Sequence, residues 1–213
     1  MSRSANISPM SQLTSLYLAP TSPDSAPDKH AVQQVLSDLD IIADPLGPAI
    51  YTAGVGFSRH VIYAGCSPFL VMQPPEDGSR QFCHVVMHGT FAQPKLVTGP
   101  NTVKPRCPAC RERFADWRER LAEWQAGSEP AHCDSCGKVS LPADLDWRGH
   151  AISGRVLIEL RNVFPGEASP SDLLMQRLET GTGEEWRYAW AAYLNTMDVR
   201  DIGADGAQPD GSP

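Results

Sequence analysis

Four of the six cysteines in this 213-residue chain form two pairs with the same short spacing. The pairs are Cys107-Pro-Ala-Cys110 and Cys133-Asp-Ser-Cys136, with 22 residues between them. Each C-x2-C turn brings two thiolates onto one metal ion, and two such turns complete the tetrahedral set of four sulfurs that zinc prefers. The spacing therefore predicts a Zn2+ site whose ligands are Cys107, Cys110, Cys133 and Cys136.

Other interpretations of this motif stay open in the sequence. The thiols could be ordinary buried cysteines or two redox pairs, and His132 could replace one thiolate. A redox C-x2-C usually follows a strand of a βαβ unit and occurs once, so two pairs favour zinc. Four thiolates close the coordination shell and leave no position for water, which predicts a structural ion rather than a catalytic one. The ion would hold together residues 104–148, which have few apolar side chains.

The stretch between the cysteine pairs has the pattern of an amphipathic helix. Phe114, Trp117, Leu121 and Trp124 follow one another at i, i+3, i+7 and i+10. This stripe either packs on the zinc module or the main domain, or it presents Trp117 and Trp124 as anchors for a partner protein.

Basic side chains are concentrated at the start of the same stretch, in residues 104–120. Arg106, Arg113 and Arg120 are candidates for partner binding beside the two tryptophans, and the basic stretch suggests a nucleic-acid-binding regulator as an alternative. Acidic residues follow at once, and the whole chain has a formal net charge of −7, which opposes a general attraction to phosphate backbones. A protein partner is therefore favoured over a nucleic acid.

A second group of side chains that could bind a metal ion or a small ligand lies upstream, at Cys66, Cys83, His84, His88 and Asn101. On a strand His84 and His88 point to one face and Cys83 to the other, so a shared site needs a bulge or Cys66. The competing interpretation is that both cysteines are small buried hydrophobic residues. An enzyme or small-ligand binder at Cys66, His84, His88 and Asn101 is the third alternative. The chain has no P-loop, G-x-S-x-G or H-E-x-x-H motif, which favours a non-enzymatic role.

The elements that position these residues alternate between strands and helices. The pattern predicts a strand over 13–18, a helix from Asp28 that ends before Pro45, and an antiparallel meander through 50–88 with strands at 60–64, 69–73 and 81–88. After the cysteines it predicts a strand over 154–163, a helix that begins at Ser171 and ends near Gly181, and a strand over 186–194.

This order predicts an α+β fold, a ferredoxin-like or related antiparallel sheet with two helices, into which a zinc-ribbon-like module with its own helix is inserted. We expect the α+β domain to comprise residues 12–103 and 149–197, the inserted module residues 104–148, and disordered tails residues 1–11 and 198–213. No apolar run is long enough to span a bilayer and no signal-peptide pattern is visible, so we expect a cytoplasmic protein with no membrane partner.

Three segments resemble those of an uncharacterised proteobacterial protein family. They are YAGCSPFLVMQP (63–74), FCHVVMHGTFAQPKLVTGPNTVKPRCPACR (82–111) and VFPGEASPSDLL (163–174), which hold a GCSP turn, a PRCPxCR knuckle and an FPGEAxPS segment. The resemblance implies a bacterial cytoplasmic origin, agrees with the zinc interpretation and implies no catalytic residue. Together with the motifs it leads to one expectation, a bacterial zinc-binding protein that acts as an adaptor, regulator or immunity-type partner of another protein.

Overall fold

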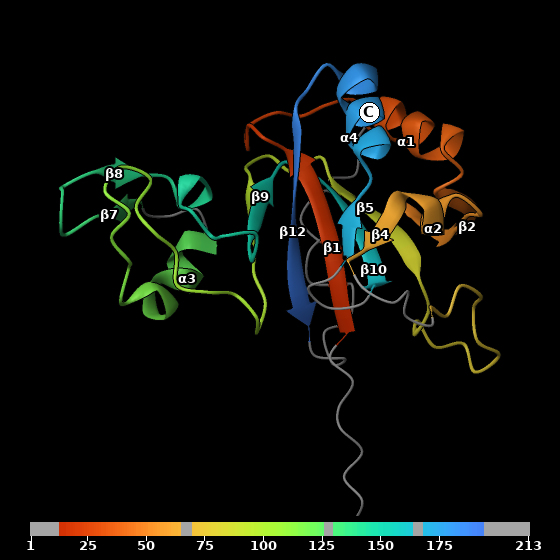
Figure 1. Cartoon of the computed structure of the whole chain (residues 1–213), viewed down its shortest axis with the longest axis horizontal. Coiled ribbons are helices and arrows are strands. Elements are labelled where there is room, and N and C mark those ends of the chain that lie inside the picture. Colours follow the sequence, from red (N-terminus) through yellow and green to blue (C-terminus); the bar gives the residue numbers. More distant parts are fainter. Residues whose placement is uncertain (1–12, 65–69, 126–129, 164–167, 194–213) are drawn as a thin grey trace, which may run out of the picture.

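The structure, a computed structural model, describes residues 13–64, 70–125, 130–163 and 168–193 (Figure 1). Its main body is a six-stranded antiparallel sheet with the strand order β12-β1-β10-β5-β3-β2. The mixed α+β class predicted from the sequence is confirmed. The six strands are β1 (Leu13–Pro20), β2 (Ile42–Gly47), β3 (Ile50–Ala53), β5 (His84–Gly89), β10 (Val156–Val163) and β12 (Trp186–Tyr193).

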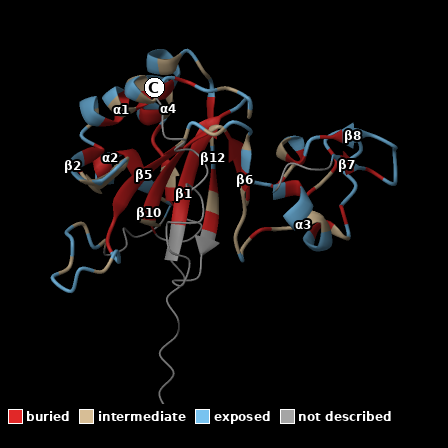
Figure 2. Ribbon diagram, turned by 180° about the vertical axis from the view of Figure 1, so that it is seen from behind, coloured by how far each residue is buried: buried red, intermediate tan, exposed pale blue. Residues whose placement is uncertain are grey.

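The main hydrophobic core lies between one face of this sheet and two helices, α1 (Lys29–Asp38) and α4 (Asp172–Thr182). Strands β1 and β10 are internal strands of the sheet and send alternate apolar side chains to this face, with Leu16 opposite Leu160. The sheet and the inner sides of the helices are accordingly buried (Figure 2). Each fully buried leucine contributes about 1.5–3 kcal/mol to the free energy of unfolding.

Both of these helices begin where the sequence predicts. At the start of α1 the side chain of Asp28 accepts a hydrogen bond from the backbone N–H two residues later. At the start of α4 the hydroxyl of Ser171 accepts one from the N–H of Leu174. These side chains satisfy donors that have no partner within the helix. Helix α4 extends slightly beyond the predicted end near Gly181, to Thr182. Gly183 caps it with a φ of 73°, in the left-handed region.

The meander predicted for residues 50–88 is wrong. Strand β3 does lie beside β5, but β4 (Val61–Tyr63) leaves this sheet and pairs with β11 (Ala168–Pro170). The start of the strand predicted at 60–64 is the end of a short helix, α2 (Phe57–His60), and the described part of 69–73 contains no strand. Alternating apolar residues indicate a strand, but they do not identify its partner.

Strand β2, which forms the edge of the sheet, was not predicted from the sequence. Pro45 lies within this strand, opposite Tyr51 of β3. A proline has no N–H to donate to a neighbouring strand, so it is tolerated at a sheet edge and not in the middle of a sheet. Helix α1 thus ends before Pro45, as predicted, but it ends at Asp38, and Asp44 and Pro45 both belong to β2.

Residues 104–148, which we call the cysteine module, project to one side of the sheet (Figure 1). Two short strands that pair antiparallel connect it to the domain, β6 (Lys95–Val97) and β9 (Ile152–Gly154). Its own elements are α3 (Trp117–Gln125), β7 (Ala131–His132), β8 (Val139–Ser140) and the 3-10 helix η1 (Pro142–Asp144). None of the helices in the described ranges is long and apolar enough to cross a bilayer.

Candidate metal centre and a buried polar cluster

The four predicted metal ligands come together in the cysteine module. All four Sγ atoms lie within 4.8 Å of one another. The Sγ atoms of Cys107 and Cys136 are 3.8 Å apart, and those of Cys110 and Cys133 are 3.6 Å apart. A tetrahedral ion with metal–sulfur distances of about 2.3 Å holds its ligand atoms about 3.8 Å apart. The four cysteines are therefore arranged to bind one metal ion.

The two C-x2-C turns share one backbone conformation. The N–H groups of Cys107 and Cys133 each donate to the carbonyl oxygen five residues later, at 2.8 and 2.9 Å. Just after each pair, the N–H groups of Arg111 and Gly137 donate back to the carbonyl oxygens of the first cysteines, at 3.0 and 2.8 Å. Arg111 and Gly137 have φ angles of 66° and 71°. Glycine adopts this left-handed conformation freely, whereas arginine adopts it at a cost of roughly 1 kcal/mol.

Backbone N–H groups and neighbouring sulfurs shift the pKa values of two of these thiols, Cys107 and Cys136. The N–H of Cys110, helped by that of Ala109, lowers the pKa of Cys107 to about 7 although desolvation opposes it. At Cys136 the N–H of Lys138 lowers the pKa, but the three neighbouring sulfurs and desolvation outweigh it and raise the pKa to about 12. Four thiolates at this spacing repel one another, so the fully ionised set requires a cation at its centre.

The aromatic stripe of α3 forms the core of the cysteine module. Trp117 and Trp124 are 5% and 3% exposed, and both meet the ring of Trp147 edge to face, with centroids 6.0 and 6.2 Å apart. Phe114 precedes the helix and packs against Trp124 in the same way. Of the two interpretations of the stripe, packing within the module fits this burial. An anchor must be accessible before binding, so this burial does not favour Trp117 and Trp124 as partner anchors, and their contact with a partner stays a prediction.

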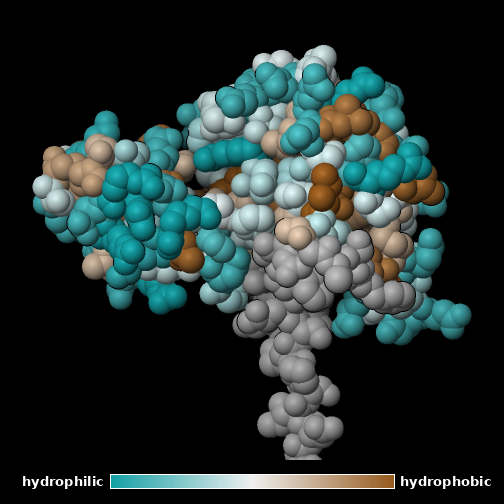
Figure 3. All heavy atoms as spheres, viewed as in Figure 1, coloured by the Kyte–Doolittle hydropathy of each residue, from teal (hydrophilic) through white to brown (hydrophobic). Residues whose placement is uncertain are grey.

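The candidate arginines lie on or near the surface of the module, whose face in Figure 3 is largely hydrophilic. Arg113 is exposed. Arg106 is half-buried, and its backbone forms bridges with Arg113 and Asp146. The Nε of Arg120 lies 2.7 Å from a carboxylate oxygen of Asp116, one turn earlier. Arg106 and Arg120 thus have contacts inside the module, and partner binding by the three arginines stays a prediction.

The second predicted site does not assemble among the described residues, and Cys66 lies outside them. His84 and His88 share one face of β5, but four residues along a strand separate their Cα atoms by about 13 Å. Asn101 donates to the carbonyl oxygen of Trp190 on β12, at 3.2 Å. Strands β1 and β10 lie between β12 and β5 in the sheet. His84, His88 and Asn101 are therefore too far apart to hold one small ligand or ion.

The sheet face opposite α1 and α4 holds a buried polar cluster that the sequence interpretation missed. Glu159 on β10 is 0% exposed, and its carboxylate oxygens lie 2.6 Å from His88 Nε2, 2.6 Å from Ser15 Oγ and 2.8 Å from Arg161 Nε. The sequence does contain one sign of this cluster, because Glu159 and Arg161 lie on the same face of the most apolar predicted strand. A central strand of a covered sheet buries both faces, so an ion pair at this position must be buried.

The donor set of the four-cysteine centre defines what it can do. Four sulfur ligands saturate a tetrahedral ion, so a bound ion would have no open position for water or substrate. Comparisons with protein-family models, with curated proteins and with solved structures found no match to this chain.

Proposed function

We propose that this chain is a bacterial cytoplasmic protein with a structural zinc ion, and that it acts by binding another protein as an adaptor, regulator or immunity-type partner. The observation that carries the proposal is the set of four sulfurs, whose separations of 3.6 and 3.8 Å fit a tetrahedral thiolate site. Among common ions zinc suits this soft, tetrahedral set. Because the shell is closed, the ion contributes folding free energy and takes no part in hydrolysis.

Two observations support a zinc-ribbon-like description of the module. The same turn conformation occurs at both cysteine pairs, and the second pair lies at the tip of the β7–β8 hairpin, between His132 and Val139. The ion would tie this hairpin to the turn that precedes α3. A segment cross-linked in this way folds with few apolar residues, because metal binding replaces part of the missing hydrophobic stabilisation.

The strand order supports a ferredoxin-like description of the domain. The order β12-β1-β10-β5, with α1 following β1 and α4 following β10, is that of two interlocked split βαβ units. The hairpin β2–β3 extends this arrangement at one edge, and the cysteine module is inserted between β5 and β10. The five cysteines that the structure describes are all free, in keeping with a reducing compartment.

The position of the module favours recognition over chemistry. Its core of tryptophans is separate from the core between the sheet and α1 and α4, so the module adds surface that the sheet domain does not need for its own stability. Since Trp117 and Trp124 are internal, a partner must contact exposed side chains such as Arg113 and Lys138.

The contacts of the basic stretch weigh against nucleic-acid binding. Residues 104–148 contain eight basic and eight acidic side chains. Arg111 pairs with Asp146 at 2.8 Å, and Arg120 pairs with Asp116 at 2.7 Å. Each carboxylate repels phosphate next to the arginine that would bind it, so the stretch offers little net attraction to a phosphate backbone.

The metal part of the proposal is tested by elemental analysis of the purified full chain. We expect one zinc per chain, and we expect Cys110→Ser to bind zinc more weakly and to lose the fixed environment of the module tryptophans. The control is Cys83→Ser, which alters a cysteine of the sheet domain. A folded protein that contains no metal and keeps its tryptophan spectrum after chelation would contradict the structural role.

The partner part is tested by photo-cross-linking in cells that express the chain. A photoreactive amino acid replaces Arg113 or Lys138, and the matched control replaces Arg177, an exposed arginine on α4. We expect one discrete protein adduct from the module positions, and its loss when Cys110→Ser is combined with them. Adducts of equal yield from Arg177, or none from either module position, would argue that the module does not bind a protein.

A further inference from the structure

The two sulfur pairs that face each other across the cysteine turns each have one exposed and one buried member. Cys110 and Cys136 are exposed, whereas Cys107 and Cys133 are buried. The Sγ atom of exposed Cys136 lies 3.8 Å from that of buried Cys107, and the Sγ atom of exposed Cys110 lies 3.6 Å from that of buried Cys133. A reagent dissolved in water therefore reaches one sulfur of each pair, and the second sulfur lies directly beside it.

The exposed sulfurs remain in their reactive form when the site holds its ion. A cysteine that coordinates a metal is a thiolate, and the thiolate is the form that hydrogen peroxide oxidises. Strands β7 and β8, which carry the second cysteine pair at their tip, lie at the end of the module away from the sheet (Figure 1). Thiolate character and access together determine which cysteines are oxidised, and Cys110 and Cys136 have both.

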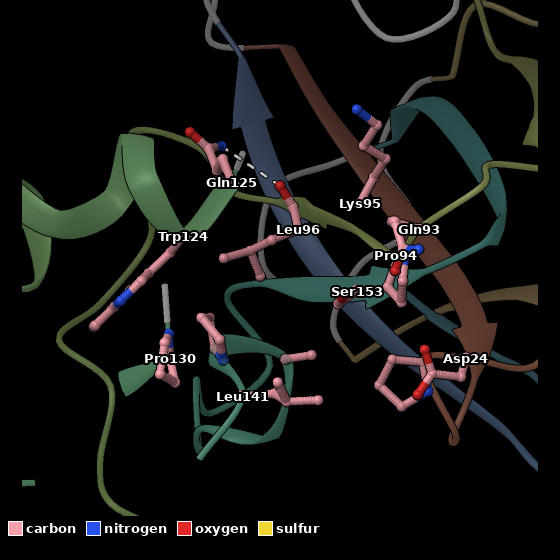
Figure 4. A pocket seen from close by; sticks show the side chains of 13 residues that line it. Asp24, Gln93, Pro94, Lys95, Leu96, Trp124, Gln125, Pro130, Leu141 and Ser153 are labelled. Atoms are coloured by element: carbon pink, nitrogen blue, oxygen red, sulfur yellow. Dashed lines mark hydrogen bonds between the residues drawn. The ribbon is translucent and has the colours of Figure 1, made fainter. Parts of the chain in front are cut away.

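The sheet domain does not cover the four-cysteine centre. The module and the domain meet across a hollow of about 470 Å3, bordered by Trp124, Pro130 and Leu141 of the module and by Asp24 and Lys95 of the domain (Figure 4). The four cysteines all lie in described parts of the chain, and none of them lines this hollow. A reagent in solution thus reaches the centre without any movement of the module against the domain.

The buried sulfurs belong to the tryptophan core of the module. Cys107 and Cys133 lie in one cluster with Trp117, Trp124 and Trp147. This packing holds the two cysteine turns against each other independently of the exposed sulfurs. A disulfide holds its sulfurs about 2 Å apart, so the sulfurs of each facing pair need to approach by less than about 2 Å, a displacement on the scale of a side-chain rotation.

We propose that hydrogen peroxide converts the zinc centre into two disulfides between the turns, Cys107–Cys136 and Cys110–Cys133, and that the ion is released while the module stays folded. This inference rests on the zinc centre of the proposed function and adds a regulation of that centre by oxidation. The exposed sulfur of each pair is the one that peroxide oxidises, and the buried sulfur is the one that resolves it.

The reaction of each pair consumes one peroxide and two protons and yields two waters. The exposed thiolate attacks a peroxide oxygen, the O–O bond breaks, and the hydroxide that leaves takes up a proton, which produces water and a sulfenic acid on the sulfur. The buried thiolate then attacks this sulfur, the S–O bond breaks, and the second hydroxide leaves as water after taking up a proton. The sulfurs are oxidised and the peroxide oxygens are reduced. Only a thiolate binds the metal, so the disulfides no longer hold the ion.

The two disulfides take over the role of the ion as a cross-link. Cys107 and Cys136 are 29 positions apart and Cys110 and Cys133 are 23 apart, so the bonds close the same part of the chain as the metal does. Oxidation therefore leaves the module folded, whereas chelation removes the ion and leaves no cross-link. Oxidation also removes the net negative charge that four thiolates keep around a divalent ion, which changes the surface that a partner meets.

The test exposes the zinc-loaded full chain to a small excess of hydrogen peroxide. A zinc-sensing dye measures the released ion, and tryptophan fluorescence reports on the module core. We expect complete release of the bound zinc with no shift of the emission to longer wavelength. A sample treated with a chelator in place of peroxide serves as the comparison, and it should lose its zinc with the shift.

Digestion with trypsin under non-reducing conditions locates the disulfides. Trypsin cleaves after the arginine and lysine residues around each cysteine pair, which places the two pairs in the separate peptides 107–111 and 121–138. Disulfides between the turns join these peptides, whereas disulfides within the turns leave them apart. We expect joined peptides whose fragmentation spectra show the proposed pairing. A thiol reductant with added zinc should then restore the original zinc content.

The matched control combines Cys66→Ser with Cys83→Ser and so removes both cysteines outside the centre. Its zinc content before oxidation establishes that the centre is intact. It should release zinc at a rate within about twofold of the unchanged chain and give the same joined peptides, because the reacting thiolates all belong to the centre. A clearly slower reaction would show that a cysteine outside the centre is the one that peroxide oxidises, and the inference would be wrong.

Other results would also overturn the inference. They are zinc that stays bound in peroxide, disulfides within the turns or in any other pairing, sulfinic or sulfonic acids in place of disulfides, and a fluorescence shift on oxidation as large as that on chelation. Its failure is distinct from failure of the proposed function. A chain that holds one zinc and keeps it in peroxide refutes the oxidation and leaves the structural zinc intact, whereas a chain purified without zinc refutes the zinc centre itself.

Discussion

His88 on β5 and Glu159 on β10 face each other diagonally across two paired strands, with Nε2 of the imidazole 2.6 Å from the carboxylate. The residues directly opposite them in the register are Leu157 and Val86. Ser15 of β1 reaches the other carboxylate oxygen, so three strands meet at one buried charge. A slip of any of them by one residue would turn a polar side chain into the opposite, apolar core. The cluster therefore fixes the register at the centre of the sheet.

The first prediction concerns stability in acid. Burial alone would raise the pKa of Glu159, but the hydrogen bond from His88 and the charge of Arg161 outweigh it and lower the pKa from 4.5 to about 2. Above about pH 4.5 the carboxylate is ionised in both states, and its contacts stabilise the fold. As the pH falls from 4.5 toward 2, the unfolded chain binds the proton first, so we expect this contribution of about 3 kcal/mol to be lost.

Urea unfolding at a series of pH values measures this effect. In Glu159→Gln the acid-dependent loss should be reduced, and the variant should already be about 3 kcal/mol less stable at pH 7 because the buried guanidinium of Arg161 loses its contact with the Glu159 carboxylate. Glu76→Gln removes an exposed carboxylate as a control and should leave both quantities unchanged. If the free energy of unfolding fell equally steeply below pH 4.5 in Glu159→Gln and in the unchanged chain, this carboxylate would not be the group that titrates.

The second prediction concerns removal of the metal. Chelation should unfold the cysteine module and leave the sheet domain folded, because the two have separate cores. The indoles of Trp117, Trp124 and Trp147 would become solvated, which shifts the fluorescence emission to longer wavelength. Amide hydrogen exchange provides the control, since β1 and β10 should keep their protection. Loss of protection in β1 at the same chelator concentration would mean that the chain unfolds as one unit.

The third prediction compares two glycines in the same conformation. Gly137 and Gly183 have φ angles of 71° and 73°, and a Cβ added to either would meet nothing within 4 Å. Alanine at each position should therefore cost roughly 1 kcal/mol of backbone strain and nothing in packing. Gly137→Ala should weaken zinc binding, since it strains the second cysteine turn. Gly183→Ala should lower the stability of the sheet domain and leave zinc affinity unchanged. Equal effects of both on zinc affinity would contradict the assignment of Gly137 to the metal turn.

The fourth prediction concerns Cys83. Burial raises the pKa of this thiol to about 12, and its Sγ lies 3.4 Å from the carbonyl oxygen of Asn162. The thiolate is the reactive form, so alkylation of Cys83 in the native chain should be very slow at pH 7 and should become fast in denaturant. Mass spectrometry of the digested protein measures labelling at this residue. Exposed Cys110 serves as the comparison and should react quickly once zinc is removed. Rapid native labelling of Cys83 would show that this part of the sheet opens often.

The features that could be predicted from the sequence are local ones. The two C-x2-C turns lie within four residues each, and the caps at Asp28 and Ser171 depend on the next two or three residues. The alternation that identified β10 likewise spans one short segment. In each case the residues that interact are close together in the chain, so their spacing carries the information.

The features that were missed depend on contacts between distant segments. Glu159 is buried because Ser15 and His88 come from strands on either side of it, and nothing near Glu159 in the sequence specifies those neighbours. The pairing of β4 with β11 is of the same kind. The stripe of Trp117 and Trp124 shows a different ambiguity, since a helix face that covers a core and a helix face that binds a partner have the same pattern.

The two strands that connect the cysteine module to the domain, β6 and β9, allow the module to be deleted or replaced by protein engineering. Val97 of β6 lies directly opposite Ile152 of β9, so the chain leaves the domain and returns to it at adjacent points. Removing everything between these two residues and joining them by a tight Asn-Gly hairpin turn would shorten the protein by a quarter and discard four of its cysteines. The module is in this sense an exchangeable cassette, and a different loop grafted onto the same two strands would have the same fixed base.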